Sequence, residues 1–147
     1  GPVARACGAP RDVRRDHPTG AYALRDVSVA TAATGDVYAR ALVRRQEIER
    51  SAAFVRELLA SLPAGDVRVA CPPPAPDAVA VSLVEGWRGE IAHVAVTDAS
   101  GRFERYKVVD PSFHNWPGLE LALRGQQISD FPLCNKSFNL SYAGHDL

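Results

Sequence analysis

The chain has 147 residues, 46% of them hydrophobic, with 17 basic and 17 acidic side chains. This length and composition suit one globular domain, residues 1–147, with a hydrophobic core. A net charge of zero provides no basic field for nucleic acid, and no apolar run approaches the roughly 20 residues that span a bilayer.

Cysteine and methionine usage limits the class of protein further. The three cysteines, Cys7, Cys71 and Cys134, are isolated and odd in number, which argues against a disulfide framework and fits a reducing compartment. Methionine is absent. We therefore expect that Gly1 is not the natural start, and that the chain is a fragment or processed product with surfaces that a missing segment covers.

Residues 1–34 form a basic region that we expect to be mostly loop, with one short helix or strand. The sequence Asp16-His17-Pro18-Thr19-Gly20 is typical of a turn, since Pro fixes φ and Gly allows unusual backbone angles. The arginines are either exposed loop residues or a docking surface for a partner; they are Arg5, Arg11, Arg14, Arg15 and Arg25.

Residues 35–63 are predicted to form one long helix, which Asp36 caps and Pro63 ends. Apolar residues recur at helical spacing, with a break at Arg44 and Arg45; they are Val37, Ala41, Ile48, Ala52, Val55, Leu59 and Leu62. No second helix of this length follows. We expect this stripe to be exposed in the chain alone and to cause self-association.

Residues 72–76 hold four prolines and are predicted to be a stiff connector. Residues 79–109 are predicted to form a small antiparallel sheet with a Gly-containing hairpin turn at 98–101. Residues 115–147 are expected to be a helical tail, capped by Asn115 and interrupted at Gly125. The predicted fold class is α+β.

Four motifs resemble, in order, the large subunit shared by membrane-bound [NiFe] hydrogenases and respiratory complex I. That family's D-x-R-x-D loop, G-D-x-Y-x-R-x-x-V-R helix start, E-x-x-R-G-x-x-x-H segment and R-x-x-S/T-x-x-N-W-P element each have a counterpart. The matching segments begin at Asp12, Gly35, Glu85 and Asp110. The resemblance to the back half of that subunit covers nearly the whole chain, and hydrogenase-4, formate hydrogenlyase and complex I 49 kDa subunits are the forms it suggests.

The tail departs from the hydrogenase pattern. Active [NiFe] hydrogenases have D-P-C-x-x-C, whose thiolates hold the metals. The corresponding residues here are Asn139-Leu140-Ser141-Tyr142-Ala143-Gly144, so Ser141 and Gly144 replace the cysteines. A serine hydroxyl is a poor ligand for a soft metal, and glycine offers none. Cys134 has the wrong spacing to substitute. No metal site is expected in this chain.

The resemblance implies an oxidoreductase subunit that takes electrons from an iron–sulfur partner and passes them toward a quinone without a nickel–iron centre. The expected partners are an Fe–S small subunit and membrane subunits, and the expected place is the cytoplasmic, inner face of the membrane. The chain itself is expected to hold no cofactor and to be inactive alone. The alternatives are a non-catalytic docking or assembly module and a piece of an active [NiFe] hydrogenase, which the missing cysteines disfavour.

Two groups of residues are candidates for the site. Arg88, Glu90 and His93 are either catalytic groups for proton movement or a structural ion pair beside a half-buried histidine. In the complex I relative the tail helps to wall a quinone-head cavity, because rings stack on the quinone and hydroxyls donate to its carbonyl oxygens. The corresponding quinone-binding candidates are Phe138, Asn139, Ser141 and Tyr142.

Overall fold

The computed structural model describes residues 1–66 and 68–146; Leu147, the last residue of the predicted tail, lies outside the described residues. It confirms the α+β class, with one long helix, a three-stranded sheet and shorter helices. The helices are α1 (Pro2–Ala6), α2 (Val13–Asp16), α3 (Val37–Ala60), α4 (Pro111–Ala122), α5 (Phe131–Phe138) and α6 (Tyr142–His145). The strands are β1 (Val79–Gly86), β2 (Gly89–Thr97) and β3 (Phe103–Val109).

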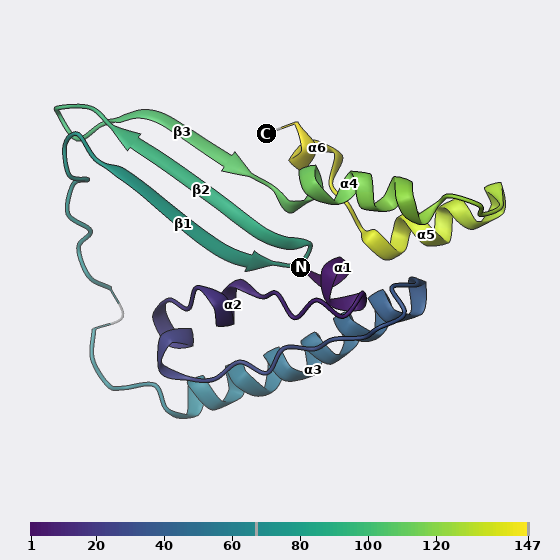
Figure 1. Ribbon diagram of the computed structural model, residues 1–147. Coiled ribbons are helices and arrows are strands. Elements are labelled where there is room, and N and C mark those ends of the chain that lie inside the picture. Colours follow the sequence, from purple (N-terminus) through teal and green to yellow (C-terminus); the bar gives the residue numbers. More distant parts are fainter. Residues whose placement is uncertain (67, 147) are drawn as a thin grey trace.

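Figure 1 shows α1 and α2 between the sheet and the long α3, with α4, α5 and α6 grouped at one end. Helix α1 packs on α3, α3 on α5, and α4 on both α5 and α6. The turn between β1 and β2 therefore points toward the place where α1, α3 and the tail helices meet (Figure 1). This arrangement brings four separate parts of the sequence to one region.

The long helix begins as predicted, because the Asp36 carboxylate accepts a hydrogen bond from the backbone N–H of Ala39 at 2.7 Å. It ends at Ala60, before Pro63, and the N–H of Ser61 donates to the carbonyls of the last turn. On its exposed side, Arg45 pairs with Glu49 four residues later at 3.1 Å.

The apolar stripe of α3 is largely exposed, as expected for the chain alone, and a different face of the helix is buried. Its buried residues are Ala39, Arg40, Val43 and Arg44, all in the first half of the helix. The stripe residues of the second half stay exposed: Leu59 is 62% exposed, and Ile48 and Val55 are about as exposed. The reason is that α1 packs on the side that carries Ala39 and Val43, while α5 contacts Arg40 and Arg44.

The sheet has the order β1-β2-β3 and is antiparallel throughout. The β2–β3 turn confirms the predicted hairpin, because Gly101 has a φ of +76° and the Asp98 carboxylate accepts hydrogen bonds from the N–H groups of Ser100 and Arg102. The proline connector runs beside this turn, where the Thr97 hydroxyl donates to the Ala75 carbonyl at 2.7 Å.

The tail differs from the prediction at its start. Helix α4 begins at Pro111, not at Asn115, because Asp110 is the cap and accepts from the Ser112 N–H at 2.7 Å. Proline fits the first helical position since its missing N–H would have no partner there. Asn115 instead lies inside the helix and donates to the Arg88 carbonyl at 3.0 Å.

The N-terminal region is also more regular than predicted. Residues 1–34 contain α1, α2 and a 3₁₀ helix at Gly20–Leu24 instead of one short element. Asp12 caps α2 by accepting from the Arg14 N–H at 3.0 Å. Short helices are marginal alone, so their formation here depends on packing against α3 and β1.

The hydrophobic core is small and divided. One cluster joins α1 to α3 through Ala6, Ala30, Ala39 and Val43, and the other joins α4 to α5 through Leu119, Cys134 and Phe138. Many large apolar side chains elsewhere are exposed. Within residues 1–66 and 68–146, no helix combines the length and apolar character required to cross a bilayer.

Candidate functional site

A buried network of ion pairs joins α1, α2, α3 and β1. Arg5 contacts Asp12 at 2.7 Å and Glu85 at 2.8 Å, and Arg14 contacts Asp12 at 2.6 Å and also pairs with Glu47. Arg5 is 2% exposed and Asp12 is fully buried. Because these charges are desolvated, each depends on its partners far more than a surface pair does.

The network sets the protonation of Asp12. Burial alone would raise the pKa of the Asp12 carboxyl, but hydrogen bonds from Arg14 and the charges of Arg14 and Arg5 together hold that pKa below its ordinary value. The same contacts with Asp12 and Glu47, opposed by burial, raise the pKa of Arg14. Both groups are therefore charged at neutral pH.

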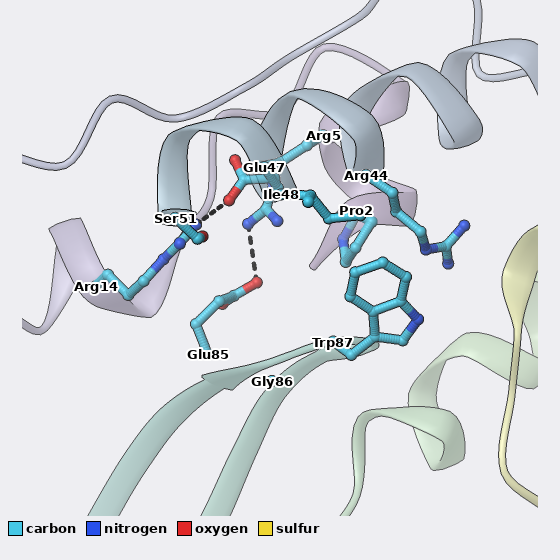
Figure 2. A pocket seen from close by; sticks show the side chains of 10 residues that line it. All are labelled: Pro2, Arg5, Arg14, Arg44, Glu47, Ile48, Ser51, Glu85, Gly86 and Trp87. Atoms are coloured by element: carbon cyan, nitrogen blue, oxygen red, sulfur yellow. Dashed lines mark hydrogen bonds and ion pairs between the residues drawn. The ribbon is translucent and has the colours of Figure 1, made fainter. Parts of the chain in front are cut away.

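A cavity of about 330 Å³ lies above this network, between α1, α3 and the β1–β2 turn. Figure 2 shows Arg14 and Glu47 at one end and Arg44 and Trp87 at the other, with Glu85 below. Its lining residues are Pro2, Arg5, Arg14, Arg44, Glu47, Ile48, Ser51, Glu85, Gly86 and Trp87. Both carboxylates of the lining are held by Arg14 and Arg5.

Three further arginines meet the tail at the end of α5. Arg44 donates to the backbone carbonyls of Ser137 and Phe138, the second at 2.8 Å, and Arg88 donates to the Asn139 carbonyl. Arg40 donates to the Ser137 hydroxyl at 2.8 Å. The bonds from Arg44 and Arg88 satisfy carbonyls that a helix leaves open at its C-terminus. Together the three arginines tie the tail to α3 and to the β1–β2 turn.

Arg44 carries its charge in an unfavourable place. Burial, followed by the positive charges of Arg40, Arg88 and Arg5, lowers the pKa of Arg44 to about 10. Its guanidinium carbon lies 5.6 Å from the centre of the Trp87 ring, within reach of a cation–π contact. The group remains a cation at neutral pH, with the indole as one wall of its surroundings.

The segment that replaces the metal cysteines is closed by hydrogen bonds to α4. The Ser141 N–H donates to the Ser112 hydroxyl at 3.0 Å, and the Ser141 hydroxyl accepts from the Gly144 N–H at 3.0 Å. A Cβ at Gly144 would lie 2.5 Å from Asp110 Cγ and 2.7 Å from its Oδ2. Asp110 thus fills the place that a side chain at position 144 would need.

The structure separates the three predicted catalytic residues. Arg88 lies in the turn and bonds to the tail, whereas Glu90 faces Arg11 at 3.3 Å on the surface. His93 lies on the opposite face of β2 from Glu90, since neighbouring positions alternate, and its Nδ1 is 2.8 Å from the Tyr106 hydroxyl. Of the three, Arg88 alone reaches the tail.

The predicted quinone-binding residues do not share one surface either. Phe138 is buried in the core, where the Arg40 guanidinium lies 4.3 Å from its ring centre. Asn139 adopts a left-handed conformation that ends α5. Ser141 and Tyr142 begin α6, and the Tyr142 ring, 70% exposed, lies 5.1 Å from the ring of Trp116.

The residues present do not form a metal cage. Across the described parts of the chain, no group of three or more His, Cys, Asp or Glu side chains is placed to hold a metal ion. Cys134, whose spacing in the sequence argued against a ligand role, is buried in the α4–α5 cluster. Its Sγ lies 3.8 Å from Arg40 Nη2. It acts there as a small apolar side chain.

Sequence reasoning missed the role of several arginines. It treated Arg5 as an exposed loop residue or a docking residue and assigned no role to Arg40, although both are buried. One signal was available: the stripe of the long helix breaks at Arg44. An arginine that interrupts an otherwise apolar helix face is a sign of a buried cation with specific acceptors.

Comparison with known proteins identifies one family and several relatives. The family described as "Respiratory-chain NADH dehydrogenase, 49 Kd subunit" matches residues 1–77 and 68–146. A carbon monoxide-induced hydrogenase of Rhodospirillum rubrum is 37% identical over 139 residues, covering 95% of this chain and 38% of the relative. Formate hydrogenlyase subunit 5 of Escherichia coli is 32% identical, covering 99% of this chain and 26% of the relative.

A subunit of the NADH-quinone oxidoreductase of Rhodospirillum rubrum is 31% identical, covering 88% of this chain and 40% of that protein. A chain of the membrane-bound sulfane sulfur reductase, an archaeal respiratory membrane complex, has the same fold, with a TM-score of 0.89 and 29% identity. All of this chain but only 42% of that one is covered. The chain therefore spans less than half the length of the relatives it matches.

Proposed function

The chain belongs to the family of the 49 kDa subunit of respiratory-chain NADH dehydrogenase, and from that premise we propose that it is part of an electron-transferring subunit without a nickel–iron centre. Its relatives are a quinone oxidoreductase subunit and hydrogenase-related subunits. In this proposal an iron–sulfur partner supplies electrons, a quinone-type acceptor receives them, and the subunit lies peripherally on the inner face of the membrane beside membrane subunits.

One observation carries the proposal: the contact between Gly144 and Asp110. In the resembled hydrogenases a cysteine thiolate occupies the position of Gly144, yet here the Asp110 carboxylate fills that space. Ser141, at the other cysteine position, uses its hydroxyl to cap α6. These residues do not fit a nickel–iron pair, which requires soft, negatively charged ligands.

The residues around the tail do fit a quinone head. The quinone itself would accept the electrons, and these residues would bind and orient it. The Ser141 hydroxyl accepts from Gly144, and its own hydrogen remains suited to donate to a carbonyl oxygen. The rings of Tyr142 and Trp116 offer apolar faces for stacking. Arg88 holds the Asn139 carbonyl and so positions the start of this wall.

Metal content and turnover of the full-length subunit in its complex test the proposal. Nickel should be absent by elemental analysis, while electron transfer to a water-soluble quinone should be measurable. Ser141→Ala should lower quinone turnover while the complex still assembles, and Ala143→Ser, at an exposed neighbour in the same short helix, serves as the control. Stoichiometric nickel, or hydrogen evolution by the complex, would show that the proposal is wrong.

A docking or assembly role is the second candidate, and the exposed stripe of α3 favours it. Ile48, Val55, Leu59 and Leu62 lie on the surface, and such a row is typical of an interaction site. In the chain alone we propose that this stripe causes self-association. If variants at His93 and Ser141 restore both assembly and full turnover, the docking role is the better explanation.

A further inference from the structure

The arginines that meet at the end of α5 have too little negative charge around them. Among the residues that the structure describes, Arg40, Arg44 and Arg88 form no ion pair with a carboxylate, and their acceptors are carbonyls, a hydroxyl and a thiol. The end of a helix contributes only about half a unit of negative charge. Asp36 lies near Arg40, so the excess of positive charge is greatest around Arg44, whose main charged neighbours are Arg40, Arg88 and Arg5.

Arg44 is the member of this group that reaches a cavity. It lines the space of about 330 Å³ beneath α3, together with Trp87 and Ile48. Its own Nε, which is buried, has no hydrogen-bond acceptor within the described part of the chain. A buried cation of this kind is costly unless a negative group lies nearby.

The carboxylates that line the same cavity do not meet this need. Glu47 pairs with Arg14 and accepts from the Ala30 N–H, and Glu85 pairs with Arg5 and accepts from the Val13 N–H. Figure 2 shows Glu47 and Arg14 at the end of the cavity away from Arg44 and Trp87. The Arg44 end therefore combines a positive potential with an apolar wall.

We propose that this cavity binds a small organic carboxylate, with its negative group toward Arg44 and its apolar body against Trp87 and Ile48. A planar ring stacks on the indole, and the carboxylate supplies the charge that Arg44 lacks. The volume of about 330 Å³ is large enough for such a group. The site is separate from the proposed acceptor wall, which lies around Ser141 and Tyr142.

Titration of the 147-residue chain with benzoate and with benzamide tests the site. The two probes have the same shape, but only benzoate is charged, so benzoate should bind at least about tenfold more tightly. Two-dimensional NMR reads the binding out through the indole N–H of Trp87. Equal shifts with both probes, or none with either, would overturn the proposal.

Variants separate the site from general charge effects. Arg44→Gln should weaken benzoate binding by at least about tenfold, whereas Arg45→Gln, at the exposed neighbouring arginine of α3, should change it less than about twofold. Since Arg44 also holds the tail, Ile48→Trp provides a second variant that fills the cavity from an exposed position and should abolish binding without unfolding the chain. Retained binding in Ile48→Trp, or equal losses in the two arginine variants, would refute the site.

Discussion

Replacing Gly144 by alanine tests the contact on which the proposed absence of metal depends. Gly144 is buried in α6, and an added Cβ would come within 2.5 Å of Asp110 Cγ. A separation below 3 Å requires a shift of the backbone or of Asp110, and overpacking of this kind costs about 1–3 kcal/mol. Helix propensity alone predicts the opposite sign, a gain of about 0.5–1 kcal/mol for glycine to alanine.

Thermal and urea unfolding show whether Gly144→Ala lowers or raises the free energy of unfolding. For a chain of this size, each 1 kcal/mol corresponds to about 2–4 °C in Tm, so Gly144→Ala should lower Tm by about 2–12 °C. Asp110→Ala removes the opposing carboxylate and also the cap of α4, at about 1 kcal/mol. In that background, Gly144→Ala should be neutral or stabilising, which gives a coupling energy of about 1–3 kcal/mol in a double-mutant cycle.

The control is Ala143→Ser, at the exposed neighbouring position, which should change stability by less than about 0.5 kcal/mol. A stabilised Gly144→Ala protein, or a cycle with no coupling to Asp110, would show that position 144 has room for a side chain. The argument against a cysteine-like ligand there would then fail.

Further predictions concern the buried charges and the exposed helix face. Arg5→Met removes the cation that Asp12 and Glu85 share, leaving Asp12 with Arg14 and Glu85 with the more distant N-terminal amino group. Breaking this buried pairing should cost about 3–5 kcal/mol in urea unfolding. The pKa of Asp12 is lower in the folded chain than in the unfolded chain. Its contribution to stability is therefore present above the unfolded pKa of about 3.9 and is lost as the pH falls through the folded value. Asp12→Asn removes this contribution, so the fall in Tm below about pH 4 should become less steep. Ser112→Ala removes the acceptor of the buried tail contact and should cost about 1–3 kcal/mol in the same unfolding assay. Leu59→Glu should reduce self-association in analytical ultracentrifugation while changing stability by less than about 0.5 kcal/mol.

The elements that local chemistry specifies were predictable from sequence. Asp36 as a cap and Gly101 in a left-handed turn each follow from the preferences of one residue, and the structure confirms both. The predicted start of α4 was wrong because two caps were available. Asp110 followed by Pro111 prevailed over Asn115, since proline loses nothing at the first position and Asn115 has a distant acceptor in Arg88.

Tertiary contacts account for what the sequence could not show. Periodicity identified an apolar stripe on the long helix but not which of its faces meets α1 and α5. The packed face contains Arg40 and Arg44, which a hydropathy pattern places outside. The Phe138 carbonyl that accepts from Arg44 is 94 residues away in the chain, so no local signal identifies it.

Distance in space, as opposed to distance in sequence, also explains why the predicted catalytic residues do not form one site. Arg88, Glu90 and His93 are close in sequence, and adjacency suggested one chemical group. Strand alternation instead places Glu90 and His93 on opposite faces of β2, while the turn directs Arg88 to the tail. Residues that meet in space here come from α1, α3, the β1–β2 turn and α5.

The proposed acceptor wall is held both by apolar packing and by hydrogen bonds from arginines. The α4–α5 cluster has Leu119, Cys134 and Phe138 as its buried members among the described residues, and Leu140 packs against it, so apolar contacts hold side chains of the tail but not its carbonyls. The carbonyls of Ser137, Phe138 and Asn139 are instead bonded to arginines of α3 and the turn. A displacement of α3 or of the β1–β2 turn would therefore be transmitted to the proposed wall through these bonds. The long helix and the proposed acceptor wall are therefore linked through Arg44, while Arg88 links that wall to the turn.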